Sequence, residues 1–374
     1  MSEKRNWLIS FFLVLAVIGS GVSGFYAGRS EAEARSREER EYEIRLNRSD
    51  LVLLDETEGP IYVTGHKSPD SDTVCCAIAY AELLKKLGYD ARPGVLGEIS
   101  RETEFILKTS GLEVPELLED VSGFNLILVD HSDYDHSADG LKDANVLAVI
   151  DHHGAGSVTT GNQLIYDARP FGAASTIVWL RYRNYGIEPD PQVACALAGA
   201  ILSDTSDFRS ANTTFADREA VKALCEIGGI ADAEMYYHMI YKYSISYEGM
   251  SDEQIFFNDF KKYEAGGTSF GIACVSSYDE ETARDLAERM KKEFPSASAK
   301  TDCDLLYAQI SIFHDDISIT YLVPSDDAAE EVIQSIYGKQ ASFDGTSYVL
   351  NPGVSRRKDL VPAITEQLEA YPKE

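Results

Sequence analysis

The stretch VTGHKSPDSDTVCCAIAYAEL, residues 63–83, decides the fold of this 374-residue chain. It starts within a short apolar run, IYVTG (61–65), which predicts a buried strand, and it continues into residues 73–89, which predict a helix. The turn between them holds His66, Asp70 and Asp72. In open α/β sheets, ligands bind outside the carboxyl ends of the strands. The stretch therefore predicts an α/β fold with a polar site where this strand ends.

The same alternation of strand and helix continues to about residue 204. NLILVD (125–130) and NVLAVID (145–151) are apolar runs that predict strands, and each ends in an aspartate. Residues 173–186 and 191–204 predict helices. Strands that alternate with helices indicate an α/β domain with a mainly parallel sheet flanked by helices.

A second, smaller α/β domain is expected in the C-terminal part of the chain. Its predicted strands are residues 268–277 and 316–324, and its predicted helices are residues 281–294 and 328–337. The expected organisation is a first domain over residues 59–242, a linker over residues 243–251 and a second domain over residues 252–374.

The amino terminus has a different composition. Residues 7–28 carry no charged side chain, and about 20 apolar residues are enough to span a bilayer. The segment is longer than a typical signal-peptide core and lacks a clear cleavage site. We therefore predict a membrane anchor in residues 1–28, with a signal segment as the alternative, followed by a charged stalk over residues 29–58. The Lys and Arg residues after the span predict a cytoplasmic body.

The overall charge and the cysteines limit the function classes. A formal net charge of −28 argues against a general nucleic-acid binder, which needs a basic surface. A small anionic substrate stays compatible, because local cations or metals reverse the sign inside a cleft. The six cysteines form no C-x-x-C pair, so they predict no disulfide framework.

Four phrases of the first domain place carboxylates and imidazoles at strand ends or helix ends. They are GHKSPDSD with His66, Asp70 and Asp72, LVDHSD with Asp130, VIDHHG with His152 and His153, and ILSDTSDF with Asp204. One such phrase is typical of a helix cap or a turn. Four together favour a metal site, because imidazole and carboxylate bind divalent ions. Several shared carboxylates favour two metals that activate a water for displacement at phosphorus.

The phrase VSRRKDLVP (354–362) adds a cationic patch to an acidic chain. Its cations are Arg356, Arg357 and Lys358. Arginine binds phosphate through two N–H groups and lysine binds it as a point charge, which favours a phosphate clamp. A run of three cations is also typical of a solvated surface, so both interpretations stay open at this point.

In order and spacing, the four acidic phrases resemble the motifs of the DHH phosphoesterase superfamily, and most closely those of the manganese-dependent (family II) inorganic pyrophosphatases. RPFGAASTI (169–177) and VSRRKDLVP (354–362) are similar to further phrases of that family, the second of them from its DHHA2 domain. The resemblance extends from about residue 60 to the C-terminus. It implies an N-terminal DHH domain, a smaller α/β DHHA2-like domain and an active site in the cleft between them.

The resemblance also implies a reaction, which is hydrolysis of pyrophosphate to two phosphates. It implies two Mn²⁺ ions, or Co²⁺ in their place, with Mg²⁺ accompanying the substrate, and a homodimer. The implied metal ligands are His66, Asp70, Asp72, Asp130, His152 and Asp204. The implied catalytic residues are Asp130 as bridging ligand, His153 and Asp204. The implied substrate-binding residues are His153, Arg356, Arg357 and Lys358.

The sequence departs from the family pattern at several phosphate contacts. The clamp has Arg357 in place of lysine, Ser68 replaces asparagine, Gly154 replaces arginine, and YEGMSDEQ (247–254) lacks a substrate-binding lysine. These departures keep two alternatives open. One is a phosphoesterase that acts on short polyphosphate or on a nucleotide phosphodiester, although the GGGH-like phrase typical of diester enzymes is missing. The other is a metal- and phosphate-binding module without turnover.

Overall fold

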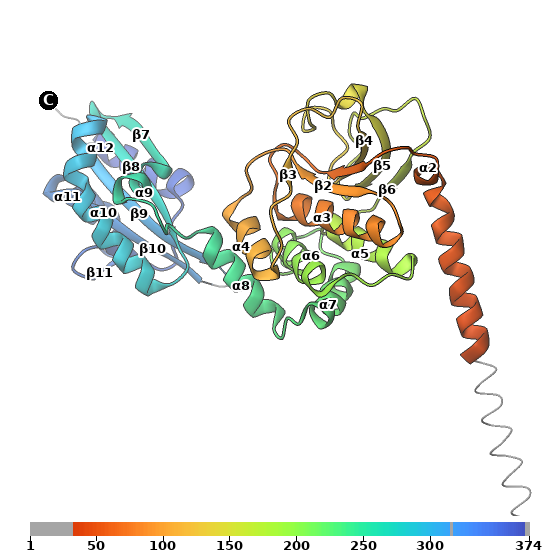
Figure 1. The fold of residues 1–374 in the computed structure, drawn as a ribbon. Helices are drawn as coiled ribbons and strands as arrows, with labels where there is room; N and C mark the ends of the chain where they lie inside the picture. The colour runs from red at the N-terminus through yellow and green to blue at the C-terminus, as the bar shows by residue number, and fades with distance from the viewer. Residues whose placement is uncertain (1–32, 315–316, 371–374) are drawn as a thin grey trace, which may run out of the picture. The chain divides into compact units, whose positions relative to one another are not determined.

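The structure is a computed structural model that describes residues 33–314 and 317–370 (Figure 1). The described residues fall into two compact units, one that ends at Ile240 and one that begins at Tyr241. Within the described residues, each unit has a six-stranded sheet with its own helices. The predicted fold class, two α/β parts of which the first has a parallel sheet, is therefore confirmed. The linker at residues 243–251 stays a prediction.

The sheet of the first unit is entirely parallel, in the order β3-β2-β1-β4-β5-β6. Its strands are β1 (Ile61–Thr64), β2 (Ala91–Val95), β3 (Glu116–Leu117), β4 (Asn125–Val129), β5 (Asn145–Asp151) and β6 (Ile165–Ala168). The helices are α3 (Ser71–Lys86), α4 (Arg101–Ser110), α5 (Ala174–Asn184), α6 (Pro191–Asp204), α7 (Phe215–Gly228) and α8 (Ala233–Ser244). Parallel strands need crossover connections, and Figure 1 shows α3, α5 and α6 packed together beside the sheet.

Both faces of this sheet are buried, which explains why its central strands are largely apolar runs. In β4, Ile127 and Val129 belong to the core shared with the helices. The alternate residues Leu126 and Leu128 pack on the other face, where residues 118–141 cover the sheet. A strand buried on both sides reads as a continuous apolar run, as NLILV does.

The sheet of the second unit is mixed, in the order β11-β12-β10-β9-β8-β7, with only β8 and β9 parallel among its described pairs. Its strands are β7 (Phe260–Ala265), β8 (Thr268–Ser277), β9 (Leu305–His314), β10 (Ile317–Pro324), β11 (Ser342–Phe343) and β12 (Tyr348–Leu350). Its helices are α9 (Asp252–Asn258), α10 (Glu280–Thr301), α11 (Asp327–Tyr337) and α12 (Val361–Ala370). One core contains side chains of α9 and α10, and a second contains side chains of α11 and α12.

Helix α10 is longer than the sequence predicts. The predicted helix covers residues 281–294, but the helix in the structure continues through Pro295 to Thr301. Proline removes a backbone hydrogen bond from a helix interior. The buried face continues beyond it, since Met290, Phe294 and Ala297 are all buried in one core. Packing of this face therefore outweighs the local cost of the proline.

The predicted membrane anchor is corrected by the structure. Among residues 33–314 and 317–370, no helix combines the length and the apolar character needed to cross a membrane. The helix at residues 33–48 is instead rich in Glu and Arg. The predictions of a transmembrane helix, of a membrane partner and of a membrane-anchored localisation are therefore not supported. The segment that motivated them, residues 7–28, lies outside the described residues.

A buried ionic network fixes the residues after this N-terminal helix to the first unit. The Arg181 side chain, 8% exposed, donates through Nε to Asp167 at 2.8 Å and through Nη1 to Asp50 at 2.5 Å. The hydroxyl of Tyr185 donates to the same Asp50 at 2.9 Å. Arg48 donates to the Tyr185 carbonyl at 2.6 Å. The C-terminal end of α5 is therefore tied to residues 48–50.

We predict that Arg181→Met destabilises the protein by about 3 kcal/mol, because it leaves Asp167 and Asp50 without their shared cation. Urea unfolding measures this change as a lower midpoint. The matched control is Arg183→Met, which removes an exposed arginine from the same helix and is expected to cost far less. Equal losses for the two variants would contradict the role given to the network.

Candidate metal centre

Residues from the four acidic phrases lie together at one edge of the parallel sheet. His66 follows β1, Asp130 follows β4, and His152 follows the last residue of β5. Asp72 lies in the first turn of α3, and the last residue of α6 is Asp204. Since parallel strands all end on the same side, residues far apart in the sequence meet there.

Local backbone features bring β1 and α3 close together. Asp70 is the N-cap of α3, and its side chain accepts a hydrogen bond from the Thr73 amide at 2.9 Å. A Cβ atom at Gly65 would lie 2.3 Å from the Thr73 side chain, so only glycine fits at this approach. Asp130 adopts a left-handed backbone conformation with φ of 61°, which is strained for a residue other than glycine. Its carboxylate accepts a hydrogen bond from Thr73 Oγ1 at 2.7 Å.

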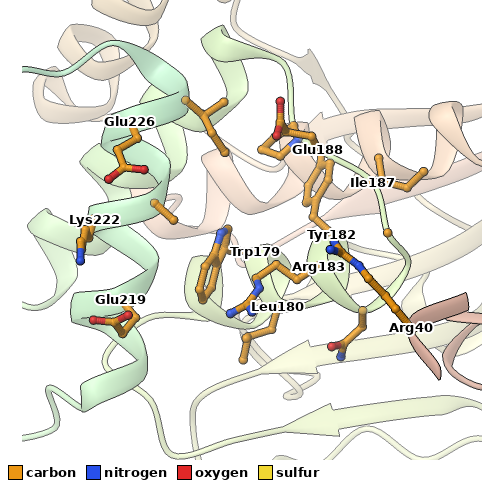
Figure 2. Close-up of a pocket in the computed structure, with 15 residues that line it drawn as sticks. Arg40, Trp179, Leu180, Tyr182, Arg183, Ile187, Glu188, Glu219, Lys222 and Glu226 are labelled. Atoms are coloured by element: carbon orange, nitrogen blue, oxygen red, sulfur yellow. The ribbon is translucent and has the colours of Figure 1, made fainter. Parts of the chain in front are cut away.

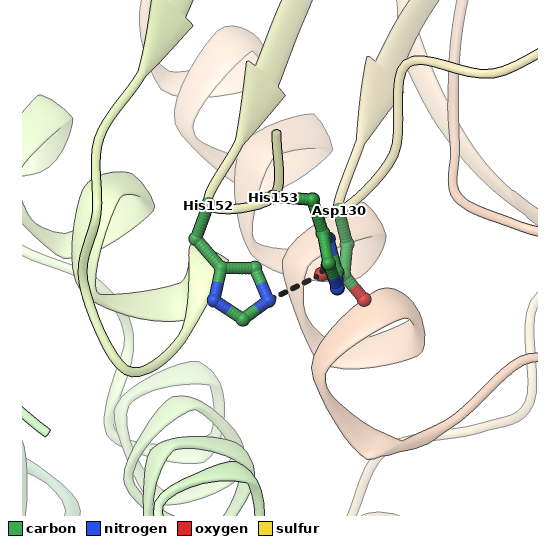
Figure 3. A group of neighbouring side chains, drawn as sticks. All are labelled: Asp130, His152 and His153. Atoms are coloured by element: carbon green, nitrogen blue, oxygen red, sulfur yellow. Dashed lines mark ion pairs between the residues drawn. The ribbon is translucent and has the colours of Figure 1, made fainter. Parts of the chain in front are cut away.

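The structure brings all the predicted metal ligands into overlapping groups that share Asp130 or His152. The groups are His66 with Asp70 and Asp130, Asp130 with His152 and His153, and Asp72 with His152 and Asp204. Within each group, one ligand atom of every residue lies within 4.8 Å of the others. Figure 3 shows His152 directed at the Asp130 carboxylate, with His153 beside them. The two imidazole rings are in contact, with their centroids 4.2 Å apart.

The shortest distances place Asp130 at the centre. Its Oδ1 lies 3.1 Å from His152 Nε2, and its Oδ2 lies 3.5 Å from His66 Nε2. His152 Nε2 is also 3.5 Å from Asp204 Oδ2, and His66 Nε2 is 3.4 Å from Asp70 Oδ2. The Asp130 side chain is only 1% exposed. One buried carboxylate therefore faces both imidazoles, each with a different oxygen.

In this arrangement, lone pairs of neighbouring imidazole and carboxylate atoms face one another. His152 Nδ1 lies 3.1 Å from the Phe171 carbonyl, which can only accept, so Nδ1 carries the proton and the Nε2 of a neutral ring presents a lone pair. The buried oxygens Asp130 Oδ1 and Asp204 Oδ2 accept no hydrogen bond from any described residue. Lone pairs that face one another at these distances repel, so a proton or a metal cation must lie among them. The donor set thus fits a divalent metal of the kind that carboxylate and imidazole bind.

The pKa values in the metal-free protein also indicate that positive charge or protons are needed among these ligands. Burial lowers the pKa of His66 and of His152, but Asp130 and the other nearby carboxylates outweigh burial and raise both to about 10. Burial and neighbouring carboxylates raise the pKa of Asp72 and of Asp204. Burial opposes ionisation of Asp130, yet the nearby imidazoles of His152 and His66 hold its pKa well below the usual range. Protons therefore occupy the place of metal at neutral pH.

Asp72 is held by the start of α5. Its oxygens accept hydrogen bonds from the amides of Ala174 at 2.6 Å and Ser175 at 2.9 Å. The N-terminus of a helix stabilises a nearby carboxylate. The phrase RPFGAASTI thus has a structural role, because its small residues let the amides reach Asp72.

Asp151 orients His153. One oxygen of Asp151 accepts from both the amide and Nδ1 of His153 at 3.0 Å, and the other accepts from Ser132 Oγ at 2.9 Å. This hydrogen bond from the ring raises the pKa of His153. Asp151 is fully buried, whereas the His153 side chain is 57% exposed. His153 is therefore a fixed imidazole that solvent and a ligand can reach.

Sequence reasoning missed Glu102, on α4. Its carboxylate accepts hydrogen bonds from Ser71 Oγ at 3.2 Å and from Ser203 Oγ. Ser71 lies between Asp70 and Asp72, and Ser203 precedes Asp204, so one side chain ties the two ligand-bearing helix ends together. No motif marks Glu102, because its partners are 31 and 101 residues away in the sequence.

A large pocket of the first unit lies away from these residues. It has a volume of about 810 Å³ and lies between the helix at residues 33–48, α5 and α7 (Figure 2). Its lining mixes cations with carboxylates, among them Arg40, Arg183, Lys222, Glu219 and Glu226. None of the metal-centre residues lines this pocket.

The structure places the predicted phosphate clamp in the second unit. Arg356, Arg357 and Lys358 form part of a short π-helical turn, Arg356–Leu360, before α12. Arg357 and Lys358 are exposed, whereas Arg356 is partly buried. Their binding of substrate stays a prediction.

We predict that Mn²⁺ binding releases protons and tightens as the pH rises from 6 to 9. The pKa values of about 10 keep His66 and His152 protonated in the metal-free protein, and metal binds only the deprotonated rings. Calorimetry in two buffers of different ionisation enthalpy counts the released protons. An affinity that is independent of pH, with no proton release, would contradict this account.

We predict that Glu102→Ala weakens Mn²⁺ binding by roughly 10- to 100-fold, because residues that orient ligands carry effects of this size. Glu102→Gln retains an acceptor oxygen and is expected to keep most of the affinity. Glu104→Ala, an exposed change in the same helical turn, is the control. If Glu102→Ala and Glu104→Ala bind Mn²⁺ equally well, Glu102 does not position the ligands.

Comparison with known proteins places the chain in a family. Residues 60–202 match the DHH family, N-terminal domain, and residues 239–367 match the DHHA2 domain. Proteins named "Probable manganese-dependent inorganic pyrophosphatase" from Clostridium acetobutylicum and Bacillus licheniformis are 36% and 35% identical, and each match covers 83% of this chain and 99% of the relative. A solved structure named as a family II inorganic pyrophosphatase, from Methanococcus jannaschii, is 31% identical with a TM-score of 0.50, and the match covers 82% of this chain and 99% of that chain. The chain belongs to the family of manganese-dependent inorganic pyrophosphatases and carries a DHH and a DHHA2 domain.

Proposed function

We propose that this chain hydrolyses inorganic pyrophosphate to two phosphate ions at the candidate metal centre. The observation that carries the proposal is the buried carboxylate of Asp130, whose two oxygens face His66 and His152 in overlapping groups of metal ligands. A carboxylate shared in this way is suited to join two metal ions, as two-metal phosphate chemistry requires. The names of the relatives supply the substrate, and the family membership supports the reaction.

The residues fall into two proposed ligand sets that share Asp130. His66 and Asp70 belong to one set, and Asp72, His152 and Asp204 belong to the other. Divalent metal held there would polarise a phosphoryl oxygen and lower the pKa of water. We propose two Mn²⁺ ions, with Co²⁺ as a substitute and Mg²⁺ bound to the substrate.

His153 is proposed to hold the proton for the leaving phosphate. Asp151 accepts from its Nδ1, which fixes the ring and leaves Nε2 for a ligand. The pKa of His153 is raised, so a larger fraction of its ring is protonated at neutral pH than for an ordinary histidine. A positioned imidazolium of this kind is suited to general-acid catalysis.

The remaining parts of the assignment come from the resemblance. We propose that Arg356, Arg357 and Lys358 bind the substrate. The domain limits of 59–242 and 252–374 and the homodimer also stay predictions.

The test is phosphate release by the full Mn²⁺-loaded chain from pyrophosphate, tripolyphosphate and a cyclic dinucleotide. We expect turnover of pyrophosphate to dominate. We expect Asp130→Ala to reduce it by more than about 100-fold, beyond the loss typical of residues outside the ligand shell. His136→Ala, an exposed histidine outside the ligand groups, is the control. Preference for tripolyphosphate or the dinucleotide would favour the related phosphoesterase function, and no release from any of the three would refute catalysis.

A further inference from the structure

The three cations of the SRRK phrase are not equivalent in the structure. The Arg356 side chain is 12% exposed, and its guanidinium donates through Nη1 to the Asp259 carbonyl at 2.7 Å and through Nη2 to Asp259 Oδ1 at 2.8 Å. Arg357 and Lys358 are exposed, and their side chains contact no charged or hydrogen-bonding partner among the described residues. One arginine is therefore fixed, while its two neighbours are free to move.

Asp259 is itself held firmly. It follows the last residue of α9 and precedes β7, and its carbonyl also accepts a hydrogen bond from the Cys274 amide on β8 at 3.0 Å. The carbonyl and the carboxylate of Asp259 thus accept hydrogen bonds from two different nitrogens of Arg356. Two fixed acceptors define the plane of a guanidinium group.

The backbone that carries Arg356 is fixed as well. The Val354 carbonyl accepts from Gln309 Nε2 at 2.7 Å, and the Val354 amide donates to Thr320 Oγ1 at 3.0 Å. The next amide, of Ser355, donates to Asp359 at 2.8 Å. Side chains of β9 and β10 therefore hold the backbone just before Arg356, and Asp259 holds the Arg356 side chain.

Asp259 does not use the whole guanidinium. A guanidinium has five N–H groups, and Asp259 accepts from only two of them. Ordering a long side chain in advance lowers the entropy that binding must remove. The negative charge of Asp259 acts in the opposite direction, because it opposes a nearby phosphate.

We propose that Asp259 is a positioning residue for the substrate, and that it acts by holding Arg356 ready for one phosphate of pyrophosphate. Arg357 and Lys358 then contact the substrate as mobile cations. The inference rests on the proposed function for the identity of the substrate. It also predicts that Asp259 has no influence on the metal centre of the first unit.

The experiment compares Asp259→Asn with Asp252→Asn in the full Mn²⁺-loaded chain. Asp252 is the matched control, because its carboxylate pairs with Arg289 at 2.8 Å and is similarly exposed, 39% against 47%. We expect Asp259→Asn to raise the KM for pyrophosphate about tenfold, which corresponds to about 1.4 kcal/mol. The kcat, the Mn²⁺ affinity and the melting temperature are expected to match those of Asp252→Asn.

A double-mutant comparison tests whether Asp259 acts through Arg356. The effect of Asp259→Asn on KM should nearly vanish in an Arg356→Ala background, and it should persist in full in an Arg357→Ala background. Equal effects in both backgrounds would overturn the assignment. A lower KM for Asp259→Asn would also overturn it, since Asp259 would then compete with the substrate.

Calorimetric binding of imidodiphosphate, a non-hydrolysable analogue, separates this inference from the proposed function. If the wild-type chain binds the analogue but releases no phosphate, the proposed function fails. The weaker binding expected for Asp259→Asn is still measurable in that case. If Asp259→Asn binds the analogue as tightly as the wild-type chain does, the positioning role is refuted, whether or not the enzyme turns over.

Discussion

Carboxylates that are buried together in the first unit repel one another, and the elements around them must compensate this repulsion. Asp72 and Asp130 are each 1% exposed, and Asp204 lies beside them. Like charges this close raise one another's pKa values, and burial raises them further. The chain can therefore keep these groups ionised only if positive charge or hydrogen-bond donors reach them. The surrounding elements supply donors at fixed positions, and two imidazoles, with protons or metal, supply the charge.

Several features that look unrelated serve this one requirement. The start of α5 directs two amides at Asp72, and Thr73 directs a hydroxyl at Asp130. Gly65 lets β1 approach α3 closely enough for that hydroxyl to reach Asp130. The left-handed backbone at Asp130 directs its carboxylate toward both histidines. This conformation is strained, and the packing around it holds it in place. The same principle operates in the second unit, where Asp259 reduces the repulsion between Arg356 and the adjacent cations.

The sequence predicts that the candidate ligands lie together because they stand after strands or at helix ends, and such positions meet at one edge of a parallel sheet. It predicts poorly where tertiary packing overrides local preference. Strand β2 contains Pro93 and Gly94, which carry no strand signal, yet Gly94 is required because a Cβ there would lie 2.3 Å from Leu118. Glu102 and Asp259 could not be found from motifs, since their partners are distant in sequence. The membrane prediction rested on the hydropathy of residues 7–28 alone, and no helix among the described residues supports it.

Helix α5 is attached at both of its ends, and this decides where the chain can be shortened. Its first amides hold Asp72, and its last turn holds Asp50 through Arg181 and Tyr185. A chain cut to begin at the first strand would lack Arg48 and Asp50, and it would remove one of the two carboxylates that pair with the buried Arg181. The helix that supports a metal ligand would then be secured at one end only. A shortened form intended for crystallisation should therefore begin within the charged N-terminal helix, well before residue 48.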